Sequence, residues 1–259
     1  MKEKGNIMKK LFVVTSLLMV FMVAPMAMAD QVSVGSSYGP YQTGSGGEFT
    51  LYPSAGLQWV LASYVQGVTK NVVAGAAPNF QTFCVEATGA EYIYKNTTYD
   101  ATIGDRAIFG GTGQGGPGDP ISVGTAWLYH QFQIAGNFDG YATYNYTNPG
   151  RSNGSPNSAD LLQKAFWYLE GEGSDPGSGN PFREAVRQKF GLANAVLDNN
   201  GQYPVAILNL WVPGHVGEWN YRIQDQLVCT PVPEPATMLL LGSGLIGLAG
   251  FARRKFVKR

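Results

Sequence analysis

Few side chains in this chain of 259 residues could do covalent or metal chemistry. There are two histidines, His130 and His215, and two cysteines, Cys84 and Cys229. Neither pair has the close spacing that a zinc site requires. We therefore expect no metal and no cofactor, and the two sulfur atoms become the main candidates for chemistry.

The simplest use of two cysteines in an exported protein is a disulfide. A bond between Cys84 and Cys229 would join the segment around Cys84 to the last predicted strand. Because it would close a long loop, it would stabilise the fold by about 4–5 kcal/mol in the chain-entropy description.

A second interpretation starts from the residues around Cys84 and Gln163. The sequence FCVE places the cysteine between an aromatic and an aliphatic residue, and LLQKAFW places the glutamine on an apolar segment that ends in tryptophan. This order resembles the thioester domains of bacterial surface adhesins. In that family the cysteine sulfur attacks the glutamine amide and ammonia leaves. The resemblance gives these roles to Cys84 and Gln163.

Such chemistry requires the two side chains to be buried and held in contact, because a free amide is a poor electrophile. Positioning can supply roughly 7–11 kcal/mol of the barrier in favourable cases. We expect Gln163 near the start of a helix, whose amide groups and dipole would stabilise the developing oxyanion. Phe166 and Trp167 would lie on the same face and keep water from the acyl bond.

The resemblance implies covalent capture of a target. An amine or hydroxyl of a surface protein or glycan would attack the acyl carbon of Gln163 and free the Cys84 thiol. This is one self-consuming reaction, so we do not expect an enzyme with turnover. The alternative function is a passive module that associates with exopolysaccharide through exposed Tyr and Trp side chains and carries the disulfide.

The segments that must position these residues have two kinds of pattern. Runs rich in aromatic and β-branched residues, bounded by turn formers, predict strands, whereas three longer segments have helical spacing. Strands at both ends with helices between them predict an α+β domain, a β-sandwich or partial β-barrel with inserted helices. The predicted strands are 49–53, 58–65, 79–87, 90–96, 141–147, 203–212 and 221–229, and the predicted helices are 123–136, 158–173 and 180–201.

The predicted helix that carries Gln163 has clear end signals. Ser158 is the expected N-cap, and Asp160 lies in the first turn, where a negative charge is favourable. Gly171 and Gly173 end the helical pattern.

The first 29 residues have the pattern of a secretory signal peptide. Two lysines precede the apolar run 11–23, and Ala27-Met28-Ala29 is a small-x-small cleavage site. We expect export through the Sec translocon and cleavage before Asp30. Residues 30–231 then form the secreted ectodomain, in an oxidising compartment.

The last 28 residues, 232–259, form a second targeting segment. Pro233-Glu234-Pro235 is followed by the uncharged run 236–251, about 24 Å long as a single-span helix, and then by Arg253-Arg254. The basic end should stay cytoplasmic. This order resembles the PEP-CTERM sorting signal of Gram-negative bacteria. The resemblance implies that an exosortase recognises the Pro-Glu-Pro tripeptide and removes the tail, so that the inner membrane holds the protein only transiently.

Charge is distributed unevenly along the chain. Between Asp30 and Pro235 there are 9 Lys and Arg against 17 Asp and Glu, a net charge of −8, whereas both ends are basic. An acidic body argues against nucleic acid as a partner. We expect the protein at the cell surface or in the extracellular matrix.

Overall fold

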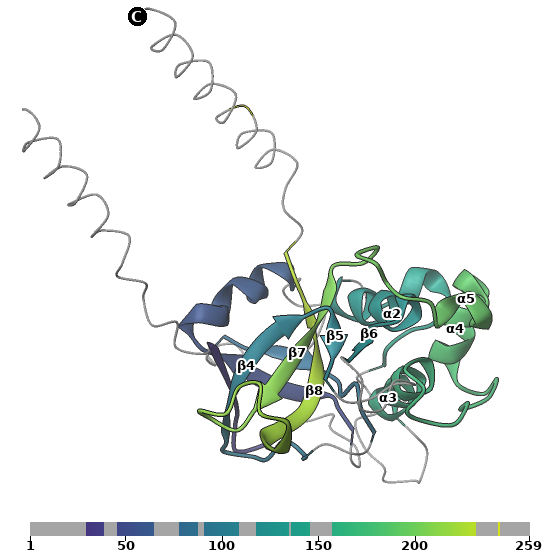
Figure 1. Cartoon of the computed structure of the whole chain (residues 1–259). Coiled ribbons are helices and arrows are strands. Elements are labelled where there is room, and N and C mark those ends of the chain that lie inside the picture. The colour runs from purple at the N-terminus through teal and green to yellow at the C-terminus, as the bar shows by residue number, and fades with distance from the viewer. Residues whose placement is uncertain are drawn as a thin grey trace, which may run out of the picture.

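The computed structural model describes residues 30–38, 46–64, 78–87, 91–108, 118–134, 136–145, 157–231 and Ser243. Its elements form one mixed α+β body (Figure 1). In chain order they are β1 (Asp30–Val34), β2 (Phe49–Pro53), the 3-10 segment η1 (Ala55–Ser63), β3 (Phe80–Thr82), β4 (Thr98–Gly104), β5 (Arg106–Ala107), β6 (Asp119–Pro120), α2 (Val123–Ile134), η2 (Phe138–Gly140), α3 (Ser158–Leu169), α4 (Pro181–Phe190), α5 (Leu192–Ala195), β7 (Val205–Trp211), η3 (Trp219–Tyr221) and β8 (Arg222–Cys229).

Six antiparallel strands form a nearly closed barrel in the order β3-β2-β1-β4-β7-β8. The two edges meet just after β3. There Cys84 lies opposite Gln226 of β8, and the neighbouring residues make main-chain hydrogen bonds of 3.0 Å across the seam, Val85 N–H to Asp225 O and Leu227 N–H to Phe83 O. The predicted α+β class with a partial barrel is therefore confirmed.

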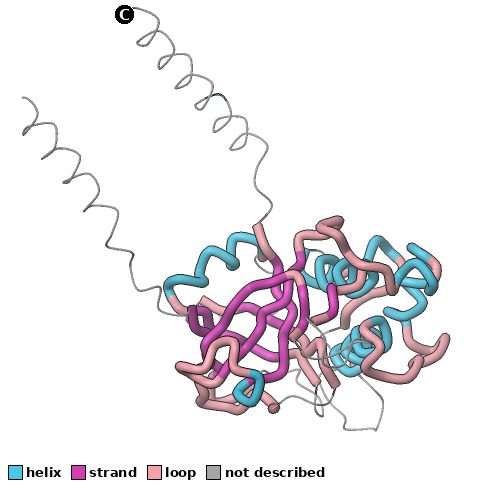
Figure 2. The backbone as a smooth tube through the Cα atoms, in the orientation of Figure 1, coloured by secondary structure: helices cyan, strands magenta, loops and turns pink. Residues whose placement is uncertain are grey.

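The helices α2–α5 lie together on one side of the sheet (Figures 1 and 2). Side chains alternate along the last two strands, as the period of two in a β-strand requires. Ile207 and Leu227 join the core beneath the helices, whereas Leu208 and Val228 join a second core that includes residues of η1. The sheet is therefore buried on both faces.

The predicted helices 123–136 and 158–173 are present as α2 and α3, whereas the predicted helix 180–201 is divided at Gly191 into α4 and α5 and is not helical beyond Ala195. The starts of α3 and α4 follow capping chemistry. Asn180 caps α4, with Pro181 in the first turn, where proline is favourable. The N-cap of α3 is Asn157, whose side chain accepts a hydrogen bond from Asp160 N–H, so the expectation of Ser158 was wrong by one residue. The Ser158 hydroxyl instead accepts from Asn145 N–H.

Some predicted strands are wrong. The segment 58–65 lies mostly in η1, which buries Leu57 and Val60 at a spacing of three residues, typical of a 3-10 turn. The run 90–96 makes one isolated bridge, between Glu91 and Ile223. The predicted strand 141–147 is also wrong in its described part, because residues 141–145 contain no strand.

The two targeting segments lie almost wholly outside the described residues. This applies to the cleavage site at Ala27 and Ala29, to Pro233-Glu234-Pro235 and to Arg253-Arg254. In the part of the chain that is described, no helix has the length and apolar character to cross a bilayer.

Candidate functional site

Cys84 lies at the seam where the barrel closes. The residues on either side of it make the hydrogen bonds to β8, so its own N–H and C=O point away from that strand. Its side chain is fully buried. The seam therefore leaves one main-chain donor and one acceptor beside a buried thiol, and both need a partner.

The side-chain amide of Gln163 satisfies both groups. Its Oε1 accepts from Cys84 N–H at 3.1 Å, and its Nε2 donates to Cys84 O at 2.8 Å. A second main-chain donor, Gly47 N–H, reaches the same Oε1 at 2.9 Å. The β2–β3 ladder pairs Phe49 with Thr82, so its continuation would place Gly47 opposite Cys84. The Gln163 amide occupies the position between them.

Two glycines allow this insertion. A Cβ on Gly46 would lie 2.4 Å from Gln163 Cγ, and a Cβ on Gly47 would lie 2.7 Å from Thr82 O. Real Cβ atoms do not approach other heavy atoms so closely. Because only glycine lacks this atom, the main chain of residues 46–47 can pack directly against the glutamine.

Two N–H groups that converge on one carbonyl oxygen form the geometry of an oxyanion hole. The donors come from Gly47 and Cys84, not from a helix N-terminus. Gln163 is the sixth residue of α3, beyond the first turn that the sequence analysis expected. The N–H groups that contact the Gln163 oxygen therefore come from the strand side of the site and not from the start of α3.

Two further glutamines hold the Cys84 thiol. Its Sγ donates to Gln224 Oε1 at 2.9 Å, and Gln226 Nε2 donates to Sγ at 3.5 Å. Both glutamines are buried on β8. Burial raises the pKa of the thiol far above its usual value, an effect that the bond from Gln226 only partly offsets. The sulfur is therefore held as a neutral thiol.

The predicted disulfide alternative is not what the structure shows, since Cys84 and Cys229 are both free and buried. Cys229 lies three residues beyond Gln226, the partner of Cys84 across the seam, or about 10 Å along the strand. A disulfide needs Cα atoms within about 7 Å. The two sulfurs also belong to different cores, because an odd separation puts side chains on opposite faces.

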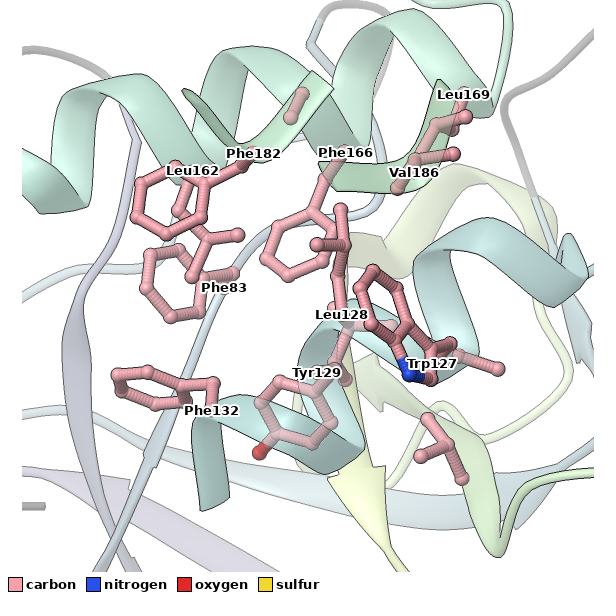
Figure 3. Packing of buried hydrophobic residues seen from close by; sticks show 14 of the residues in the cluster. Phe83, Trp127, Leu128, Tyr129, Phe132, Leu162, Phe166, Leu169, Phe182 and Val186 are labelled. Carbon is pink, nitrogen blue, oxygen red and sulfur yellow. The ribbon is translucent and has the colours of Figure 1, made fainter. Parts of the chain in front are cut away.

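The two expected shielding residues differ in position. Phe166 is fully buried and packs against Phe83, the residue before Cys84, with 5.2 Å between ring centroids (Figure 3). Trp167 is half-buried and lines a surface pocket of about 550 Å³ together with Leu161, Lys164 and the segment after α3. Phe166 therefore lies in the core beneath the helices, whereas the Cys84 side chain belongs to the other core, and Trp167 faces a surface pocket.

The histidines have other neighbours. His130 of α2 lies near Tyr203, and His215 stacks on Tyr221 and pairs with Glu218. Within the residues that the structure describes, no group of three or more His, Cys, Asp or Glu side chains could hold a metal.

A pair of buried acids lies next to the thiol site. Asp225 N–H donates to Glu86 Oε2 at 2.6 Å, and Ile108 N–H donates to Asp225 Oδ2 at 2.6 Å. Burial, strengthened by the neighbouring carboxyl, raises the pKa of Glu86 well above its usual value. Burial also raises the pKa of Asp225, to about 6. The pair therefore retains a proton at pH values where exposed carboxyls are ionised.

Sequence reasoning missed the residues that complete the site. The sequence around Gly47 does not indicate a contact with Gln163, which lies far along the chain. The sequence QDQ in β8 does carry one, because alternation places Gln224 and Gln226 on the same face of a strand. Two buried amides on one face of a core strand are unusual enough to indicate a polar site.

The comparisons with known proteins concern the C-terminal segment. Comparison of the chain with curated proteins and with solved structures finds no match. Residues 231–255 match the family described as the PEP-CTERM protein-sorting motif. That match covers Pro233-Glu234-Pro235 and Arg253-Arg254, from which the sequence analysis inferred this signal. The chain therefore carries a PEP-CTERM sorting motif, which marks it as an exported protein of a Gram-negative bacterium that is processed by an exosortase and sorted to the cell surface.

Proposed function

We propose that the ectodomain forms an internal thioester between Cys84 and Gln163 and uses it once, to attach the protein covalently to a surface target. The observation that carries this proposal is the environment of the Gln163 carbonyl. Two main-chain N–H groups bind its oxygen while both hydrogen bonds to the Cys84 main chain hold the amide beside the cysteine. Such donors stabilise negative charge on that oxygen during attack on the carbon.

Formation of the bond exchanges sulfur for nitrogen. Cys84 Sγ attacks Gln163 Cδ, the Cδ–Nε2 bond breaks, and the thiol proton leaves with the nitrogen as ammonia. Because burial keeps the thiol neutral, the proton must transfer during the reaction. Sγ must also leave Gln224 Oε1, its acceptor in the thiol form. No oxidant or metal is required.

In the capture step the sulfur of Cys84 is the leaving group. An amine nitrogen or hydroxyl oxygen of the target attacks Cδ, the Cδ–S bond breaks, and the nucleophile's proton passes to sulfur. The products are an amide or ester at Gln163 and a free Cys84 thiol. The thiol regains Gln224 as its hydrogen-bond acceptor, which favours the captured state. An exported protein could anchor itself in this way to a protein or glycan after the exosortase removes its membrane tail.

Methylamine tests this proposal in the exported, processed protein. We expect one methylamine per chain, located at Gln163 by peptide mass spectrometry, and one new thiol, located at Cys84 by alkylation. Cys84→Ala should abolish both. Gln163→Glu should do so as well, and it retains an oxygen for the two N–H donors, so loss of folding is less of a concern than with alanine.

Two further variants make the assignment specific. Cys229→Ala removes the other sulfur and should leave the reaction unchanged. Gln224→Met removes the amide that contacts Sγ directly and should still allow methylamine at Gln163. Incorporation at residue 224 in the wild-type protein, or none at any glutamine, would overturn the proposal.

A second candidate function, passive binding to exopolysaccharide, is supported by exposed aromatic side chains. Tyr92 and Tyr94 lie beside the start of β8, where Glu91 bridges to Ile223, and the adjacent 3-10 turn exposes Trp219 and Tyr221. Aromatic rings with polar edges suit contacts with sugars. Sedimentation with purified exopolysaccharide tests this function, since Trp219→Ala should weaken it and Cys84→Ala should not.

A further inference from the structure

A fully buried carboxylate adjoins one of the two donors to Gln163. Glu48 follows Gly47 and has no exposed surface. The Tyr144 hydroxyl, also buried, donates to its Oε2 at 2.7 Å. Burying a carboxylate is unfavourable unless hydrogen bonds compensate for lost water. This buried carboxyl group therefore lies directly beside a glycine whose N–H binds the Gln163 carbonyl.

Tyr144 connects Glu48 to the helices. Its ring packs on Phe132 of α2, with 4.8 Å between centroids, and lies 6.1 Å from the ring of Phe182 in α4. The next residue, Asn145, donates its N–H to the Ser158 hydroxyl in the first turn of α3 at 2.9 Å. The Glu48–Tyr144 hydrogen bond therefore links the glycine segment to the body that carries Gln163.

This link matters because a glycine has no side chain that could hold its main chain in place. Gly46 and Gly47 have no side chains that could fix their main chain, yet Gly47 N–H must point at Gln163 Oε1 to within hydrogen-bond geometry. The adjacent residue with a side chain is Glu48, and its carboxylate is held in the aromatic core. The hydrogen bond between this carboxylate and Tyr144 can therefore hold the main chain of Gly47 in place.

We propose that Glu48 and Tyr144 are positioning residues, which hold Gly47 N–H in place as an oxyanion donor. This inference rests on the proposed thioester for its chemical consequence, although the positioning itself does not. Removing an oxyanion donor outright typically slows a reaction by about 10²–10³. Loosening one by loss of the Glu48–Tyr144 hydrogen bond should therefore slow capture by about tenfold or more.

The test compares single-atom changes in the same core. Tyr144→Phe removes the hydroxyl that holds Glu48. Tyr129→Phe is the matched control, because this tyrosine is also buried but its hydroxyl donates to Gln81 O and lies 3.2 Å from the Tyr64 hydroxyl. Gln81 O also accepts a hydrogen bond from Gln133 Nε2. Glu48→Gln is the conservative variant, because its amide oxygen can still accept from Tyr144.

Two readouts separate positioning from general stability. The first is hydrogen exchange of Gly47 N–H in the exported, processed protein, corrected for global unfolding. The second is the rate of methylamine uptake, accompanied by the infrared stretch of the acyl carbonyl, which rises in frequency when a donor is lost. We expect Tyr144→Phe to speed exchange of Gly47 and slow uptake by about tenfold or more, with Tyr129→Phe unchanged and Glu48→Gln close to wild type.

Each contrary outcome is decisive. Unchanged Gly47 exchange in Tyr144→Phe would overturn the positioning role, as would an equal slowing of uptake in Tyr129→Phe. If the wild-type protein takes up no methylamine, the proposed thioester fails. The exchange comparison then still decides whether Glu48 and Tyr144 hold Gly47.

Discussion

The side-chain oxygen of Gln163 accepts a hydrogen bond from the main-chain N–H of Cys84, 79 residues earlier in the chain. The same glutamine returns a hydrogen bond from Nε2 to Cys84 O. Through these two hydrogen bonds the Gln163 amide takes the place of a neighbouring strand, at the point where the β2–β3 ladder opens. One arrangement therefore satisfies the main chain of a buried cysteine and fixes the amide of Gln163 against it.

Gly46→Ala tests whether close packing of the main chain is required. The added Cβ would lie 2.4 Å from Gln163 Cγ, so the amide must shift away from its two donors. We expect loss of methylamine uptake and a decrease of about 1–3 kcal/mol in the free energy of unfolding. Gly179→Ala is the control, because its Cβ would meet no atom within 4 Å. Wild-type uptake in Gly46→Ala would contradict this role.

Phe166→Leu tests the shield over the acyl bond. Phe166 lies three residues after Gln163 on α3 and packs on Phe83, so a smaller side chain should admit water to the acyl group from the helix side and speed hydrolysis of the thioester several-fold. The loss of stability should stay below the roughly 3–5 kcal/mol typical of Phe→Ala. Trp167→Leu should change hydrolysis less, because Trp167 lines the surface pocket. Loss of amine reactivity with time, followed by thiol titration, measures both rates. A larger effect at Trp167 would reverse the assignment.

Much of this arrangement could be inferred from local sequence, and the rest could not. The amphipathic pattern of 158–173 is local and predicts α3 correctly, and the helical pattern of 180–201 predicts α4, although the helix breaks at Gly191. β1 and β4 were missed because Asp, Ser and Gly interrupt their patterns, although both strands are paired within the barrel. The seam at Cys84 depends on contact between residues over a hundred positions apart, which no local pattern records. For the same reason Gly47 was not foreseen, whereas the alternation of Gln224 and Gln226 on β8 is a local signal that was missed.

The buried acids predict a dependence of stability on pH. Asp225 has its pKa raised to about 6 and Glu86 has a pKa well above its usual value, so the folded protein retains protons that the unfolded chain releases above about pH 4. Stability from this pair is therefore present at low pH and lost as pH rises through 6. In urea unfolding, the wild-type free energy should fall relative to Asp225→Asn by up to about 1.4 kcal/mol per pH unit between pH 4 and 6. Parallel profiles for the two proteins would contradict this assignment.

The sorting motif predicts the compartment in which a protein with an altered tail accumulates. Replacing Pro233, Glu234 and Pro235 together by alanine should leave the protein in the inner membrane of a host that has an exosortase. Cell fractionation and immunoblotting of the wild-type and variant chains measure this. Release of the wild-type protein with its tail intact would show that removal of the tail is not the sorting step.

The most direct test of the thioester is the mass of the exported, processed protein under non-reducing conditions, with its two ends fixed by their terminal peptides. We expect a mass lower than that of the amino-acid sequence by one ammonia, and the same deficit in Cys229→Ala. Cys84→Ala and Gln163→Glu should show no deficit. A wild-type mass equal to that of the unmodified chain, with two free thiols after unfolding, would contradict the formation of a bond between Cys84 and Gln163.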